Sequence, residues 1–415
     1  MSKLFKRNTN FRSLLLFTSF FGIGRGIFAM FMMWAIHALY QNPIYTGVAG
    51  AMFAAPMMAS FIIGPFVDRW CKVAVLRISC FVMLIAVGVV MVAPNVFDGP
   101  GAWFMLFSIL MFSIAAVFGN AAGTALLPQV VGGDDLVKAN VMVQITGTVT
   151  GLAIGVVLYV LMLRGAAFEL VYGVNAAVLL LGLVFSFGLR GARAVAEAEQ
   201  VSFKAYFNEL RAGLSFVAKG AMLPLVIGMI FMSFAADMAY VNLPMFAEEH
   251  LGTATGFIIL SAIAMAGGVI GSYICGVVAP KLALWKIFVM CFIAAGVARI
   301  LFVMVIPDNF TRALLIHVLY AGLASTVVIF FRSLTQKLPP SHFVGRVTTL
   351  TASFQGVAAA FGALLGGYLG SVLPRVDVVF FIQGAAYIAI GLGLCVSGRV
   401  RGLPKIGDVV AEEGL

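Results

Sequence analysis

Twelve long apolar runs, each close to the length that crosses a lipid bilayer, dominate this sequence. A helix needs about 20 apolar residues to span the hydrocarbon core. Hydrophobic residues make up 62% of the chain and charged residues only 10%, against roughly 25% charged in soluble domains. Lipid must therefore be the solvent for much of the folded chain, and a large soluble domain is excluded. The predicted spans cover residues 12–38, 47–67, 76–93, 102–123, 138–163, 168–189, 222–247, 256–279, 285–306, 311–335, 347–373 and 376–398.

The order of these spans repeats once along the chain. A shift of about 212 residues lays residues 64–69 on 276–281 and Arg25 on Asp237. Such duplication is common in membrane transporters. We therefore predict an all-α membrane protein with twelve transmembrane helices in two pseudo-symmetric six-helix bundles. The predicted parts are an N-terminal bundle, a cytoplasmic linker, a C-terminal bundle and a cytoplasmic tail, at residues 1–189, 190–221, 222–398 and 399–415.

Two polar segments between spans are predicted to lie at the cytoplasmic surface. Residues 124–137 are expected to form a loop or a short surface helix. In the linker, apolar residues from Phe203 to Val217 recur at helical spacing, and charged residues occupy the other face. This pattern predicts an amphipathic helix on the membrane surface, with a solvated linker helix as the alternative.

Basic residues gather on one side of the predicted spans. With a cytoplasmic N-terminus, 21 of the 26 Lys and Arg residues lie inside, and only Arg164, Arg312 and Arg375 lie outside. The positive-inside rule then places both termini in the cytoplasm of a bacterial-type inner membrane. The net charge of +10 is thus a sign of topology, and no nucleic acid partner is expected. The first apolar run is too long for a signal peptide, so we expect a retained helix.

The loop after the second span contains a glycine followed by charged residues at fixed spacing, Gly64-x-x-x-Asp68-Arg69-x-x-Lys72. Asp68 suits a contact with a helix N-terminus or a cytoplasmic arginine that closes the inner face, and Gly64 permits close helix approach. The alternative is an ordinary positively charged loop. The motif resembles the signature of the major facilitator superfamily, with Cys71 at the position of the second glycine.

Two further segments are similar to loops of one branch of that superfamily. Residues 128–140 and 339–347 resemble the corresponding loops of macrolide-efflux-like transporters. This resemblance implies a monomeric secondary active transporter that exports small amphipathic molecules or drugs in exchange for protons, and not an enzyme. The alternatives are a metabolite importer or facilitator and a protein that flips lipid-like amphiphiles.

Two charged residues lie deep inside predicted spans. Arg25 is about 13 residues, or roughly 20 Å, from either end of its span, so its side chain cannot reach the interface. Asp237 is the only deep acid and matches Arg25 in the repeat. We expect both to face one another or the substrate, and Asp237 to carry the coupling proton. A dry surrounding favours a neutral carboxyl and a nearby arginine favours an ionised one. The alternative is a structural ion pair.

Other polar and apolar residues inside spans are candidates for gating or for the substrate cavity. Arg299 and Arg346 are gating candidates, although Arg299 is close enough to the outer end to extend to the interface. Asp377 and Glu169 at outer helix ends are expected to be solvated, with a role in outer gating as the alternative. The cavity candidates, each of which is equally suited to helix packing, are Phe28, Met32, Asn120, Gln144, Phe234, Met238, Asn242, Gln355 and Gln383.

Several kinds of site have no motif in the sequence. There is no Gly-x-x-x-x-Gly-Lys-Ser/Thr loop for a nucleotide phosphate and no His-Glu-x-x-His. The four histidines are scattered without a second ligand at metal spacing, and the five cysteines have no paired spacing. We therefore expect no catalytic residue, cofactor or metal. Glycines repeat at every fourth position in the fifth and eleventh spans, which suits helices that pack or slide closely.

Overall fold

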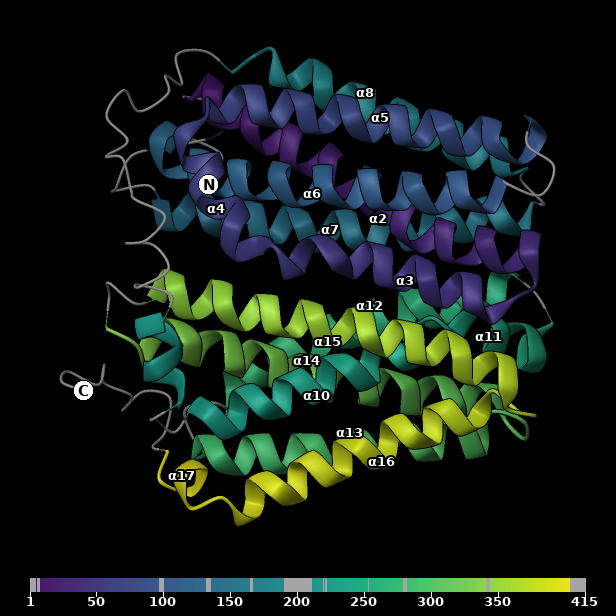
Figure 1. The fold of residues 1–415 in the computed structure, drawn as a ribbon, viewed down its shortest axis with the longest axis vertical. Coiled ribbons are helices and arrows are strands. Elements are labelled where there is room, and N and C mark those ends of the chain that lie inside the picture. The colour runs from purple at the N-terminus through teal and green to yellow at the C-terminus, as the bar shows by residue number, and fades with distance from the viewer. Residues whose placement is uncertain are drawn as a thin grey trace. The chain divides into compact units, whose positions relative to one another are not determined.

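The computed structural model describes residues 5, 8–96, 101–131, 136–164, 167–189, 211–218, 220, 222–252, 254–278, 282–340 and 344–403. All regular structure in these ranges is helical (Figure 1). The helices are α2 (Thr9–Tyr40), α3 (Pro43–Met58), α4 (Ser60–Arg69), α5 (Lys72–Val96), α6 (Gly101–Val131), α7 (Leu136–Leu163), α8 (Phe168–Ser186), α10 (Met222–Tyr240), α11 (Leu243–Leu251), α12 (Ala254–Val278), α13 (Leu284–Val305), α14 (Phe310–Lys337), α15 (Val344–Val372), α16 (Asp377–Val396) and α17 (Gly398–Arg401).

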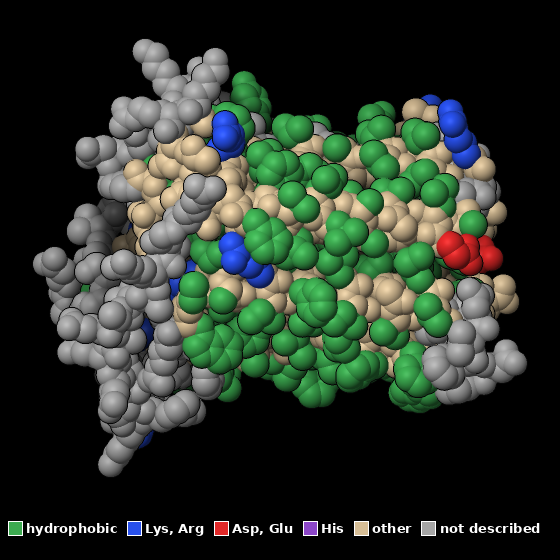
Figure 2. Space-filling model, turned by 90° about the horizontal axis from the view of Figure 1, so that it is seen from above, with side chains coloured by type: hydrophobic (Ala, Val, Ile, Leu, Met, Phe, Trp, Pro, Cys, Tyr) green, Lys and Arg blue, Asp and Glu red, His purple; other side chains and the backbone are tan. Residues whose placement is uncertain are grey.

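The helices have the length and composition of membrane spans. Among the described residues, ten segments are long and apolar enough to cross a bilayer, and eleven if α11 and α12, bent by 120°, count as one. The helix α7 has 28 residues, about 42 Å, at the position of the fifth predicted span. Figure 2 shows hydrophobic side chains over the middle of the visible face and charged ones toward its ends. The prediction of an all-α membrane protein is confirmed.

The chain divides into two compact units. The N-terminal unit comprises Met1–Gln41 and Ala59–Gln200, and the C-terminal unit comprises Asn42–Met58 and Val201–Leu415. The helix α3 belongs to the C-terminal unit because it packs along α15.

The core of the N-terminal unit forms around α2, which packs against α6, α7 and α8. Phe28 stacks on Phe112 with ring centroids 3.7 Å apart. Asn175 donates a hydrogen bond from Nδ2 to the Gly24 carbonyl at 3.1 Å, which joins α8 to α2. The bond gives the buried amide of Asn175 a partner where water is absent.

In the C-terminal unit, glycines bring helix backbones together. A Cβ on Gly367 of α15 would lie 2.7 Å from the Gly47 Cα of α3. On another side of α15, Gly362 and Gly366 face the backbone of α10 at Phe234 and Met238. The predicted glycine repeat of the eleventh span is therefore a packing surface for two helices.

The seventh predicted span is not one continuous helix. It divides into α10 and α11 at Val241 and Asn242, which form a turn. Asn242 donates from Nδ2 to the Met238 carbonyl at 3.0 Å and to the Gly366 carbonyl of α15 at 2.8 Å. The amide thus pairs one carbonyl at the end of α10, where the helix leaves carbonyls without partners, and joins this end to α15.

Residues 124–131 form neither the loop nor the separate surface helix predicted for residues 124–137, because α6 continues to Val131. Pro128 lies in the last turn, where a missing N–H removes only one helix bond. Asn8 donates from Nδ2 to the Val130 carbonyl at 2.9 Å and accepts from the Phe11 N–H at the start of α2. One asparagine therefore caps the ends of two helices.

Most of the predicted amphipathic linker helix lies outside the described residues. Residues 211–218 are helical. Phe216 and Val217 pack in the core of the C-terminal unit with Leu225 of α10. This part of the linker is therefore joined to the bundle that follows it.

Candidate functional site

Asp237 lies in α10, one helical turn before the break at Val241. Its side chain is half-buried, and it forms no ion pair with any residue that the structure describes. The helix has 19 residues and contains no other charged residue. A carboxylate in such a helix requires access to water, a partner or a proton.

Arg25 lies near the middle of α2, about 22 Å from either end of that 32-residue helix. The flanking glycines, Gly24 and Gly26, face Leu179 and Ile154 inside the N-terminal unit. Arg25 itself is exposed. Because a guanidinium at this depth is strongly disfavoured in lipid, the side chain requires water or an anionic partner.

Arg299 is enclosed within the C-terminal unit, and only 3% of it is exposed. Its Nε donates to Gln383 Oε1 at 2.7 Å, and Gln383 Nε2 donates to the Tyr320 hydroxyl at 2.8 Å. The guanidinium carbon also lies 4.6 Å from the ring centres of both Tyr320 and Phe380. The suggestion that Arg299 extends to the outer interface is therefore wrong, because hydrogen bonds and aromatic faces hold it inside.

His317 completes this cluster, which we call the Arg299 network (Arg299, His317, Tyr320 and Gln383). Its Nδ1 is 3.3 Å from an Arg299 terminal nitrogen and its Nε2 is 3.1 Å from the Leu260 carbonyl. Arginine remains protonated, so His317 Nδ1 must accept. The ring proton is then on Nε2, which donates to Leu260. The network joins α12, α13, α14 and α16 through a neutral histidine.

The structure separates the cavity candidates into two groups. Asn120 is exposed, and Phe234 and Gln355 are half-buried. Gln355 Oε1 accepts a long bond of 3.4 Å from the Ser233 hydroxyl. The side chain of Gln144 lies outside the described residues. Five candidates are almost fully buried, namely Phe28, Met32, Met238, Asn242 and Gln383.

The predicted cytoplasmic motif falls at the junction of α4 and α5. Gly64, Asp68 and Arg69 belong to α4, but their side chains lie outside the described part of the chain. Lys72 is the first residue of α5 and is 4% exposed. Arg346 is half-buried in the first turn of α15. The closing contact expected of this motif stays a prediction.

Sequence reasoning named Arg299 and Gln383 as separate candidates but did not predict that they meet in one network with His317 and Tyr320. The other members of this network lie 18 to 84 residues from Arg299 along the chain, and no short motif joins them to it. One feature of the sequence could have indicated the network: Arg299, His317 and Gln383 are polar residues within apolar spans of the same half of the chain.

An all-helical fold of membrane-spanning length, with charged side chains inside its spans, defines a multi-pass membrane transporter. The family model described as Major Facilitator Superfamily matches residues 14–363. The chain therefore belongs to the Major Facilitator Superfamily, whose members are transporters and not enzymes. No curated protein matches the sequence.

Solved transporters share this fold at low sequence identity. The nucleoside transporter NupG is 14% identical with a TM-score of 0.69, over 93% of this chain and 98% of that one. The peptide transporter POT in complex with sulfate is 11% identical with a TM-score of 0.72, over 96% of each chain. A D-xylose-proton symporter is 12% identical with a TM-score of 0.73, over 96% of this chain and 98% of its own. These likenesses establish the fold alone.

Proposed function

We propose that this transporter exports small amphipathic molecules in exchange for protons by alternating access. The observation that carries the proposal is Asp237, a half-buried carboxylate in an apolar helix that breaks one turn later. Direction and substrate class follow from the resemblance of residues 128–140 and 339–347 to macrolide-efflux-like transporters. Both termini are proposed to lie in the cytoplasm of a bacterial inner membrane, with the protein acting as a monomer.

Asp237 is suited to carry the coupling proton. Enclosure in apolar surroundings favours the protonated carboxyl, and access to water favours the carboxylate. Alternating access exposes one site to the two sides in turn, so the same group takes up a proton on one side and releases it on the other. A break in the helix beside the carboxylate supports this role, because discontinuous spans supply ion sites in other transporters.

Arg25 is proposed to face the same substrate pathway. Its exposure near the middle of α2 supports a wet surface, since lipid disfavours a guanidinium there. Cavity-lining side chains are proposed from the candidates that are not enclosed, namely Asn120, Phe234 and Gln355. Asp68, Arg69 and Arg346 are proposed for closure at the cytoplasmic face.

The deciding experiment compares Asp237→Asn with wild type in proteoliposomes under an imposed pH gradient. Substrates are first chosen from a resistance and uptake panel in a strain lacking its own efflux pumps. The variant is expected to lose gradient-driven transport and to keep substrate binding, because the amide cannot exchange a proton. Asp308→Asn, the same change in an exposed turn before α14, is the matched control and should behave as wild type.

Three outcomes would contradict the proposal in different ways. Unchanged gradient dependence in Asp237→Asn removes this residue from proton coupling. Accumulation of a metabolite, in place of resistance to added compounds, indicates an importer or facilitator. Movement of labelled lipid between the leaflets of reconstituted vesicles indicates an amphiphile flippase.

A further inference from the structure

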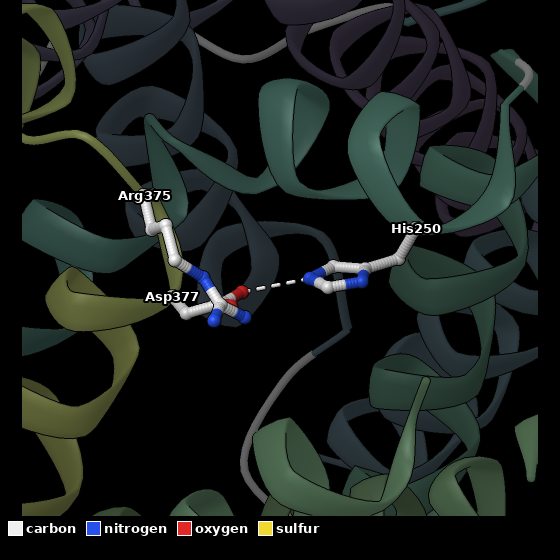
Figure 3. Close-up of polar contacts among 3 residues, drawn as sticks. All are labelled: His250, Arg375 and Asp377. Atoms are coloured by element: carbon white, nitrogen blue, oxygen red, sulfur yellow. Dashed lines mark hydrogen bonds and ion pairs between the residues drawn. The ribbon is translucent and has the colours of Figure 1, made fainter. Parts of the chain in front are cut away.

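Three residues with metal-binding side chains meet where α11 ends and α16 begins. Glu249 and His250 are in the last turn of α11, and Asp377 is the first residue of α16. One ligand atom from each of the three lies within 4.8 Å of the other two. His250 Nε2 is 2.7 Å from Asp377 Oδ1, as Figure 3 shows. We call this group the His250 cluster.

The His250 cluster rests on a rigid aromatic base. The His250 ring centre lies 4.5 Å from that of Phe246, which is fully buried. Phe246 in turn lies 4.5 Å from Phe380 and 5.5 Å from Phe302. Asp377 is only 3% exposed. These contacts hold two of the three ligands in place without an ion, which lowers the conformational entropy lost on binding.

The charges of the cluster favour a cation. Glu249 and Asp377 are two acids close enough to share one ion, and the negative C-terminal end of α11 offsets the positive N-terminal end of α16 at which Asp377 lies. Arg375 pairs with the second oxygen of Asp377. The Arg375 side chain is 69% exposed, so water can solvate its guanidinium when a metal ion displaces it from Asp377.

We propose that the His250 cluster binds a divalent transition-metal ion of the Zn²⁺ type. One imidazole nitrogen and two carboxylates form a donor set that Zn²⁺ accepts, with a fourth position open to water. Magnesium and calcium prefer oxygen ligands alone. Two ligands about 2.0–2.1 Å from a tetrahedral ion lie about 3.3 Å apart. The His250 and Asp377 atoms therefore need to separate only slightly from their present 2.7 Å.

Bound Zn²⁺ would take the place of the hydrogen bond between His250 Nε2 and Asp377 Oδ1, with the neutral imidazole bound through Nε2 and its proton on Nδ1. The ion would fasten α11 to α16 through metal–ligand bonds. Because α11 is the part of span seven beyond the break at Asn242, the ion would restrict movement of this short helix. Asp377 is 127 residues from His250 along the chain, so no short motif predicts this site.

Isothermal titration of tag-free, purified protein with ZnCl₂ tests the proposal without any knowledge of the substrate. Wild type is expected to bind one Zn²⁺ per chain saturably and MgCl₂ not at all. His250→Gln and Glu249→Gln should each weaken Zn²⁺ binding at least about tenfold, because each removes a ligand. Arg375→Gln should tighten binding, because it frees a carboxylate oxygen.

Glu248→Gln is the matched control, since Glu248 precedes the cluster in the same helix and is not one of its three ligands. Its affinity should stay within about twofold of wild type. Thermal unfolding of every variant without metal identifies any variant that fails to fold. If one of His250→Gln and Glu249→Gln does not fold, the Zn²⁺ affinity of the other tests the proposal. Absence of saturable wild-type binding, or unchanged affinity in folded His250→Gln, would overturn the proposal.

Discussion

Replacing Gln383 with leucine tests whether the Arg299 network stabilises the C-terminal unit. Gln383 accepts a hydrogen bond from Arg299 and donates one to Tyr320, at 2.7 and 2.8 Å. Leucine fills much of the same space but makes neither bond. Arg299 is 3% exposed and Gln383 is 1% exposed, so water cannot replace the lost acceptor. The variant should therefore show the full effect of leaving a buried charged donor unpaired.

The expected loss of folding free energy is about 2 kcal/mol. A hydrogen bond to a charged group contributes about 1.5–3 kcal/mol and a neutral one about 0.5–1.5 kcal/mol, whereas bonds between membrane helices average about 0.6 kcal/mol. Arg299 keeps its contact with His317 and its aromatic neighbours, which reduces the loss. About 2 kcal/mol corresponds to a roughly 30-fold change in the folding equilibrium.

Equilibrium unfolding in mixed micelles of rising SDS content, followed by tryptophan fluorescence, measures this loss. Gln355→Leu is the matched control, because Gln355 is half-buried and its bond to Ser233 is 3.4 Å long. The free energy of unfolding of Gln355→Leu should fall by less than about 0.5 kcal/mol, the range expected for weak or exposed contacts. Equal losses in the two variants would refute the reasoning. The double variant with Arg299→Met should lose less than the sum of the single changes, because no unpaired charge remains.

Two further predictions concern helix packing and capping, and the same unfolding assay measures both. Gly271→Ala should lower the free energy of unfolding by about 1–3 kcal/mol, because the added Cβ would lie 2.8 Å from the Gly322 Cα. Gly88→Ala is the control and should leave the free energy of unfolding unchanged, because no atom lies within 4 Å of its added Cβ. Asn8→Ala should lower the free energy of unfolding by about 1–2 kcal/mol, because it removes the cap of α2 and the hydrogen bond to the Val130 carbonyl. An unfolding transition unchanged from wild type would show that Asn8 does not stabilise the two helix ends.

The positions of the spans could be predicted because apolar length is a local property of the sequence. The span predicted at residues 76–93 is α5, which runs from Lys72 to Val96, and the other predicted spans correspond to helices in the same order. Breaks and extensions could not be predicted in this way. The break after α10 is stabilised by the bond of Asn242 to Gly366, 124 residues away. The extension of α6 is stabilised by Asn8, 122 residues from Val130.

The same distinction applies to the charged side chains. Arg25 and Asp237 stand out because each is a charge deep in an apolar run, and that is visible in any short window of sequence. The environment of Arg299 depends on Gln383, 84 residues away. The His250 cluster depends on Asp377 in another helix. Which polar residues meet inside a membrane protein is decided by helix packing, and helix packing is not a local property.

The backbone contacts of α15 have a mechanical consequence. Where Gly367 meets Gly47, and Gly362 meets Phe234 of α10, backbone lies directly on backbone. Helices joined by interdigitated side chains must change rotamers or pull knobs from holes before one can shift along the other. Backbone contact at these glycines lowers that barrier locally, whereas the bond from Asn242 to the Gly366 carbonyl resists a shift of α15 relative to the end of α10.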